Sequence, residues 1–102
     1  MVWVDVIGVE EFGDRDVIGV KGNGVDIAVY RLEGRYFATQ NVCTHQFAFL
    51  SEGYVVDGCI ECPLHQAMYD IKTGKGQGGL AKVDLKTYTI KMEAGRILVS
   101  IE

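Results

Sequence analysis

The chain is poor in several residue types, and each scarcity narrows what the protein can be. Among 102 residues it has one proline, two histidines and three cysteines. No apolar run approaches the roughly 20 residues that a transmembrane helix needs. The N-terminus has neither a basic segment nor twin arginines before its apolar residues. We therefore expect no membrane span, no secretory leader and a cytoplasmic location.

The balance of charge is acidic, with a formal net charge of −4 at pH 7. A surface of this sign repels nucleic acids and anionic membranes, so neither is expected as a partner. An odd number of cysteines in a reducing compartment argues against a disulfide framework and favours metal or redox chemistry. The length suits one hydrophobic core, and we expect residues 1–102 to form a single domain.

Short segments in which apolar and polar residues alternate predict an all-β protein, a sandwich or small barrel. The 13 glycines favour tight turns between short strands. Hairpin turns are expected at the Asn23-Gly24 pair and at residues 33–34 and 93–95. No stretch shows a helical stripe longer than two turns. The expected strands are residues 3–7, 17–20, 25–31, 35–39, 88–92 and 96–101.

The middle third of the chain concentrates the residues that can do chemistry, and residues 36–71 contain no Lys or Arg. Both histidines lie beside cysteines: Cys43-Thr44-His45 is followed, after sixteen intervening residues, by Cys62-Pro63-Leu64-His65. In an extended loop this spacing lets a thiolate and an imidazole turn toward one point. Cys43, His45, Cys62 and His65 are therefore candidate metal ligands.

Two thiolates and two imidazoles suit either of two metal sites. One is a tetrahedral zinc ion. The other is a [2Fe–2S] cluster in which two histidines replace two cysteines on one iron. Zinc fingers usually take two cysteines from one knuckle and two histidines from a helix, whereas here each motif contributes one of each. The interleaved order favours the iron–sulfur cluster, and zinc remains the alternative.

With these motifs the chain resembles the Rieske ferredoxin family, specifically the small ferredoxins of bacterial aromatic-ring-hydroxylating oxygenase systems. The segments that carry the resemblance are N-V-C-T-H, L-S-E-G-Y, I-E-C-P-L-H-Q, Y-D-I-K-T-G-K and a later K-T-Y. The resemblance implies a Rieske-like antiparallel β fold of three small sheets with a two-loop tip that binds one [2Fe–2S] cluster. The implied ligands are Cys43, His45, Cys62 and His65.

The resemblance also implies a function without an active site of its own. Such a ferredoxin carries single electrons from a flavin-containing reductase to the terminal oxygenase of an aromatic-ring-hydroxylating system, and a monomer is expected. Two other hypotheses compete with it. One is a small Rieske-fold subunit of a nitrite-reductase-like complex, whose members commonly lack the ligands. The other is a zinc-stabilised interaction module.

Three positions are expected to tune the cluster. High-potential Rieske proteins have a disulfide between the two loops, but Ala48 and Leu64 occupy the equivalent places here. They also have a serine where this chain has Ala67. Tyr69 matches the tyrosine whose hydroxyl bonds a ligand sulfur in those proteins. The resemblance therefore implies a potential that is low within the Rieske range and slightly raised by Tyr69.

The expected tip is apolar, and a partner is expected to dock there through Gln46, Phe47, Leu64 and Gln66. Phe49 suits the core as well as the surface. Cys59 lies outside both motifs and is expected to be a core thiol. Residues 74–79 match the G-x-G-x-x-G dinucleotide pattern formally. The flanking βαβ unit that this pattern requires cannot be read in the sequence, so we expect no nucleotide site.

Overall fold

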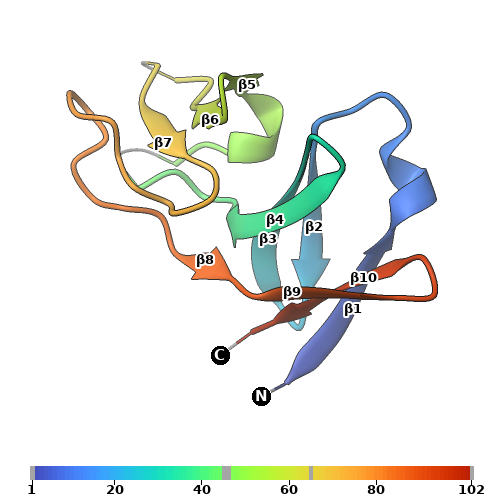
Figure 1. The fold of residues 1–102 in the computed structure, drawn as a ribbon. Coiled ribbons are helices and arrows are strands. Elements are labelled where there is room, and N and C mark those ends of the chain that lie inside the picture. The colour runs from blue at the N-terminus through green and yellow to red at the C-terminus, as the bar shows by residue number, and fades with distance from the viewer. Residues whose placement is uncertain (1, 45–46, 65, 102) are drawn as a thin grey trace.

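The computed structural model describes residues 2–44, 47–64 and 66–101, which form three antiparallel sheets (Figure 1). The first sheet has the order β1 (Trp3–Gly8), β10 (Arg96–Ser100), β9 (Ile90–Glu93). The second sheet has the order β2 (Val17–Gly22), β3 (Val25–Leu32), β4 (Arg35–Gln40), β8 (Thr87–Tyr88). The third sheet has the order β5 (Tyr54–Val56), β6 (Cys59–Glu61), β7 (Met68–Asp70). The all-β prediction, with three small sheets, is confirmed.

Helical structure within the described residues is limited to two short 3₁₀ segments, η1 (Val9–Phe12) and η2 (Leu50–Glu52). No helix in this part of the chain is long and apolar enough to cross a membrane.

The predicted hairpins are confirmed, and their turns have the expected backbone geometry. Asn23 and Gly24 join β2 to β3 with φ values of +53° and +81°, the left-handed region that two-residue hairpin turns of this kind require. The turn between β9 and β10 repeats this pattern at Ala94 and Gly95. Alternation and turn residues therefore predicted both the strands and their pairing in these hairpins.

One predicted strand, residues 88–92, is divided between two sheets. Tyr88 in β8 pairs with Ala38 of β4, whereas Ile90 in β9 pairs with Val99 of β10. The chain therefore passes from the second sheet to the first at Thr89. Continuous alternation cannot reveal such a change of sheet, because both partner strands accept an extended segment.

Two hydrophobic cores share the central strand β3, whose Ile27, Ala28, Val29 and Tyr30 side chains are all fully buried. Ile27 and Val29 belong to the core that includes β1 and β10 residues. Ala28 and Tyr30 belong to the other core, which includes residues of the third sheet and its loops. Because successive side chains of a strand point to opposite faces, β3 serves as the wall between the two cores.

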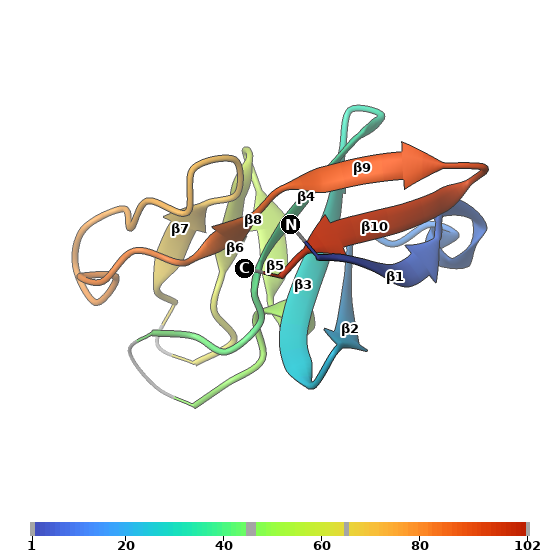
Figure 2. The same cartoon turned by 90° about the horizontal axis from the view of Figure 1, so that it is seen from below.

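Three loops extend from the same end of the molecule in both ribbon views (Figures 1 and 2). They are the first cysteine loop (residues 41–49), the second cysteine loop (residues 62–67) and the third loop (residues 71–86). Hydrogen bonds fasten the third loop to β7: Gln77 N–H donates to the Met68 carbonyl at 2.9 Å, and Asp70 N–H donates to the Lys75 carbonyl at 2.8 Å. This end of the fold brings both cysteine motifs together.

The Ile97→Ala variant should test the core between the first and second sheets. Ile97 on β10 is fully buried, and removing its outer atoms from a packed core should lower the free energy of unfolding by about 2–5 kcal/mol. Met92→Ala is the matched control, since Met92 is the cross-strand partner of Ile97 but is exposed. Denaturant titration measures both variants. Equal losses would show that the core is not where the structure places it.

Candidate metal centre

The two cysteine loops are closed by the same type of backbone hydrogen bond. Cys43 N–H donates to the Ala48 carbonyl at 2.9 Å, and Cys62 N–H donates to the Ala67 carbonyl at 2.7 Å. In each case the acceptor lies five positions after the cysteine. The two loops therefore hold Cys43 and Cys62 by equivalent hydrogen bonds, although their sequences and the spacing of their motifs differ.

A pair of polar side chains fixes the base of the first cysteine loop. Asn41 Nδ2 donates to Ser51 Oγ at 3.0 Å, and Asn41 Oδ1 accepts from Ser51 N–H at 2.8 Å. Leu50 N–H donates to the Asn41 carbonyl at 2.7 Å, so three hydrogen bonds join the two ends of the loop. The position of Cys43 is thus set by the strand that precedes it and by η2, which follows it.

The Cys43 and Cys62 side chains lie in one core and interact with each other. Both residues are buried, and no disulfide joins any of the three cysteines, all of which the structure describes. The pKa of the Cys62 thiol is raised to about 11, mainly by burial; a backbone hydrogen bond from Leu64 lowers it and the neighbouring Cys43 thiol raises it. Two soft sulfur donors from different loops are therefore close together, which fits a thiophilic metal.

A hydrogen-bonded network surrounds the Cys43 sulfur. The Tyr69 hydroxyl lies 3.4 Å from Cys43 Sγ and 2.9 Å from Thr44 Oγ1. Thr44 Oγ1 in turn donates to the Val83 carbonyl at 2.8 Å. Burial is the main reason that the pKa of Tyr69 is raised to about 12. Tyr69 therefore keeps its proton at neutral pH, and the structure places it beside a sulfur, as the sequence resemblance implied.

The other two positions expected to tune the cluster contact Cys62 through their backbone. Leu64, whose side chain is exposed, supplies the backbone hydrogen bond that lowers the pKa of Cys62. Ala67 is buried, and its carbonyl closes the second cysteine loop. Neither residue has a side-chain hydroxyl or thiol to add to the site.

Exposed apolar side chains occur on all three loops and form what we call the tip surface: Phe47, Leu64, Leu80 and Val83. Phe47 is 76% exposed and makes an edge-to-face contact with Phe49, which is half-buried, at 5.6 Å between ring centroids. Gln66 is exposed and lines a shallow hollow of about 330 Å³ that also includes Leu80. The hollow links the second cysteine loop to the third loop.

Three predicted site residues, His45, Gln46 and His65, lie outside the described residues. No group of three or more potential metal ligands converges within residues 2–44, 47–64 and 66–101. The two cysteines are the members of the predicted ligand set that the structure places, and it places them together.

The prediction that Cys59 is a core thiol is wrong. Cys59 on β6 is only half-buried, and the pKa of its thiol is raised by burial and by the carboxylates of Asp70 and Asp57. It lies on the central strand of the third sheet but outside the core, because its neighbour Ile60 occupies the inward-facing position of this short strand. The thiol is therefore mostly protonated at neutral pH and is a weak nucleophile.

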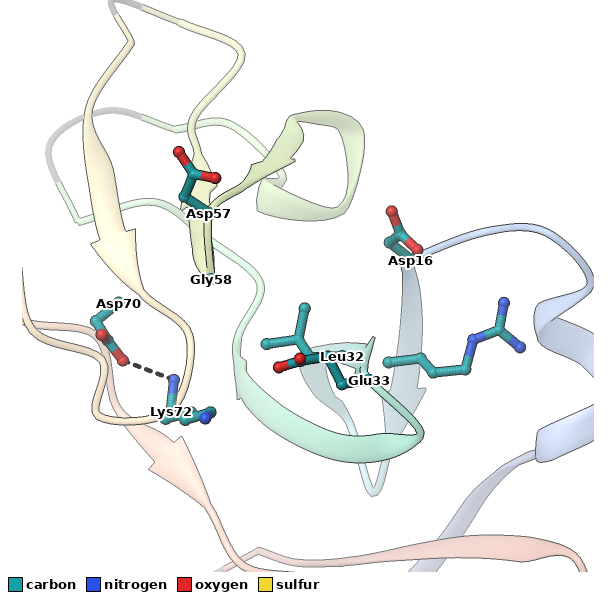
Figure 3. Close-up of a pocket in the computed structure, with 8 residues that line it drawn as sticks. Asp16, Leu32, Glu33, Asp57, Gly58, Asp70 and Lys72 are labelled. Carbon is teal, nitrogen blue, oxygen red and sulfur yellow. Dashed lines mark hydrogen bonds between the residues drawn. The ribbon is translucent and has the colours of Figure 1, made fainter.

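A polar cleft of about 540 Å³ opens between the second and third sheets (Figure 3). Its acidic groups are Asp16, Glu33, Asp57 and Asp70. Asp70 accepts a hydrogen bond from Lys72 N–H at 2.9 Å, which fixes the turn at the end of β7. The lining includes no cysteine or histidine, so the cleft is separate from the cysteine site.

Sequence reasoning missed Thr44 and Val83 as members of the site. Thr44 lies within the first motif, but its partner Val83 is 39 positions away in the chain. A threonine between two candidate ligands was the available signal. The contact could not be inferred from it, because the position of the third loop depends on tertiary packing.

Comparisons with known proteins agree with this arrangement. Residues 2–89 match the family described as Rieske [2Fe–2S] domain. The ferredoxin component of the naphthalene 1,2-dioxygenase/salicylate 5-hydroxylase systems of Ralstonia sp. is 42% identical, over 98% of this chain and 96% of that protein.

Solved structures of similar proteins share the fold. The ferredoxin of Sphingomonas yanoikuyae B1 superposes with a TM-score of 0.89 at 31% identity, over 96% of this chain and 97% of the other. A chain from the complex of reduced oxygenase and oxidized ferredoxin in carbazole 1,9a-dioxygenase gives a TM-score of 0.88 at 29% identity, over 97% and 93% of the two chains. The protein therefore belongs to the Rieske [2Fe–2S] family.

Proposed function

We propose that the protein is an electron-transfer ferredoxin of a multicomponent aromatic-ring-hydroxylating oxygenase system and binds one Rieske [2Fe–2S] cluster. Its partners are a flavin-containing reductase, which supplies electrons, and a terminal oxygenase, which receives them. The observation that carries the proposal is the meeting of Cys43 and Cys62 in one core at the end of two loops closed in the same way. The similarity to ferredoxin components of dioxygenase systems supports the partners.

The proposed ligands are Cys43 and Cys62, together with His45 and His65 from the sequence motifs. When bound, a [2Fe–2S] cluster supplies one-electron oxidation and reduction. The chain excludes water from the two sulfurs by burying them, and the Leu64 backbone and the Tyr69 hydroxyl lie within hydrogen-bonding reach of them. These groups hold the sulfurs in place and stabilise negative charge on them.

The protein acts as a carrier rather than as a catalyst. The relatives are named as ferredoxin components, and the polar cleft between the sheets is separate from the cysteine site. We infer that residues 1–102 act as one domain and as a monomer in the cytoplasm, with partners meeting at the tip surface. Small patches of this kind suit weak redox complexes, which must form and separate in each electron-transfer cycle.

Electron paramagnetic resonance of the dithionite-reduced protein, with metal analysis, tests the cluster and its ligands. We expect a Rieske signal and about two irons per chain. Cys43→Ser should abolish the signal and lower the free energy of unfolding, because bound metal contributes to folding. Cys59→Ser is the matched control and should retain both irons. Zinc in place of iron would support the interaction-module hypothesis, and a native signal in Cys43→Ser would remove Cys43 from the ligand set.

Replacing Tyr69 with Phe should lower the reduction potential. The change removes a hydroxyl that can donate to the Cys43 sulfur, and such a bond stabilises the added negative charge of the reduced state. Tyr30→Phe is the control, since Tyr30 lies in the same core but its hydroxyl bonds Thr39 Oγ1 at 2.8 Å. Protein-film voltammetry measures both variants. An unchanged potential in Tyr69→Phe would mean that this hydroxyl does not tune the site.

The Phe47→Ala variant should weaken docking to the oxygenase. Fewer than about 30% of interface residues cost more than about 1 kcal/mol when truncated, and we expect Phe47 to be one of them. A loss of about 1–1.4 kcal/mol predicts a fall of about fivefold to tenfold in kcat/KM for the ferredoxin. Tyr54→Ala on β5 removes an aromatic side chain that is also exposed, by 63%, but lies outside the tip surface. Turnover of the reconstituted system should fall only for Phe47→Ala, while both reduction potentials stay unchanged. Equal effects of the two variants would argue against docking at Phe47.

A further inference from the structure

The donor and the acceptor of each hydrogen bond near Cys43 can be assigned by counting the available protons. Thr44 Oγ1 lies 2.8 Å from the Val83 carbonyl, which has no proton to give. A threonine hydroxyl has one proton and two acceptor sites. Thr44 therefore donates its only proton to Val83 and can act only as an acceptor toward other groups.

The Tyr69 hydroxyl consequently has two acceptors for one proton. It lies 2.9 Å from Thr44 Oγ1 and 3.4 Å from Cys43 Sγ. A cysteine that binds metal is a thiolate and has no proton to donate. With Thr44 already committed to Val83, both neighbours of Tyr69 compete for the same O–H group. The contact with Thr44 lies within the usual range for a hydroxyl–hydroxyl hydrogen bond.

We propose that Thr44 is a positioning residue that draws the Tyr69 proton away from the Cys43 sulfur and thereby keeps the reduction potential lower than Tyr69 alone would set it. The inference rests on the proposed function, because it takes Cys43 as a cluster ligand. When one electron is added, no covalent bond forms or breaks, and Tyr69 and Thr44 keep their protons. Thr44 weakens the hydrogen bond that the Tyr69 hydroxyl donates to the Cys43 sulfur.

The two residues that follow Val83 are held in place by hydrogen bonds within the third loop. Gly76 N–H donates to Asp84 Oδ1 at 2.9 Å, and Leu85 N–H donates to the Gly74 carbonyl at 2.7 Å. A Cβ at Gly76 would lie 2.0 Å from the Ala81 carbonyl oxygen, and one at Gly74 would lie 2.3 Å from that of Leu85. These glycines let the loop pack closely against itself, and this packing keeps the acceptor for the Thr44 proton in place.

A double-mutant cycle on the purified holoprotein tests the proposal, with the reduction potential as its readout. In Thr44→Val the Cys43 sulfur is the acceptor that remains for the Tyr69 proton among the residues that the structure describes. The ratio of reduced to oxidised protein at a fixed applied potential should therefore rise by about threefold to tenfold, where tenfold corresponds to about 59 mV for a one-electron couple. Thr44→Ser keeps the hydroxyl and should leave the potential unchanged. Thr44→Ala gives the same prediction as Thr44→Val if the valine variant does not fold.

The double variant Thr44→Val with Tyr69→Phe distinguishes an effect through the Tyr69 proton from a general change in polarity near the sulfur. Without the Tyr69 hydroxyl, Thr44→Val should no longer raise the potential. An equal shift in both backgrounds, or no rise in Thr44→Val or Thr44→Ala, would overturn the role of Thr44. The electron paramagnetic resonance signal distinguishes the two proposals. Its absence from the unmodified protein would refute the cluster itself. A normal signal, with a reduction potential that Thr44→Val does not raise, would refute the role of Thr44 alone.

Discussion

The burial of β3 on both faces is the constraint on which the metal centre depends. Ile27 and Val29 fix one face against the first sheet, so the other face is a rigid surface on which the cysteine loops pack through Ala28 and Tyr30. The first cysteine loop starts from this wall, since Asn41 N–H donates to the Asp26 carbonyl at 3.1 Å. A site whose ligands come from separate loops needs such a shared reference, because the loops alone do not fix their relative position.

The two cysteine loops pair the backbone N–H of their cysteine in the same way, although their sequences differ. Each contains a buried cysteine whose N–H is satisfied by a carbonyl five positions later, so neither loop leaves that donor unpaired in the core. The differences lie in what surrounds each sulfur. Cys62 has a backbone donor within its own loop, at Leu64, whereas Cys43 has the side chain of Tyr69 from β7. The environment of Cys43 therefore depends on tertiary packing and can be altered by single side-chain substitutions.

The parts of the fold that the sequence predicts are those with local signals. Alternation and an Asn-Gly pair predicted the β2–β3 hairpin, and the spacing of cysteine and histidine pointed to the two loops. The third sheet was implied by the family resemblance, but alternation did not locate its strands, because they are three residues long and too short to show it. Cys59 was misplaced for the same reason, since the inward face of so short a strand is decided by packing. The Thr44–Val83 contact links distant parts of the chain and leaves no local pattern.

The proposed docking surface and the proposed tuning contact meet in the third loop, but they use different parts of Val83. The Val83 side chain is 62% exposed on the tip surface, whereas its backbone carbonyl accepts the Thr44 proton. A carbonyl is present whatever the side chain, so the residue at this position can change to suit a different partner while the acceptor for Thr44 remains. The bonds that hold the carbonyl in place involve Gly74, Gly76 and Asp84 rather than the Val83 side chain. The fold can therefore vary its partner surface without altering the hydrogen bonds near the Cys43 sulfur.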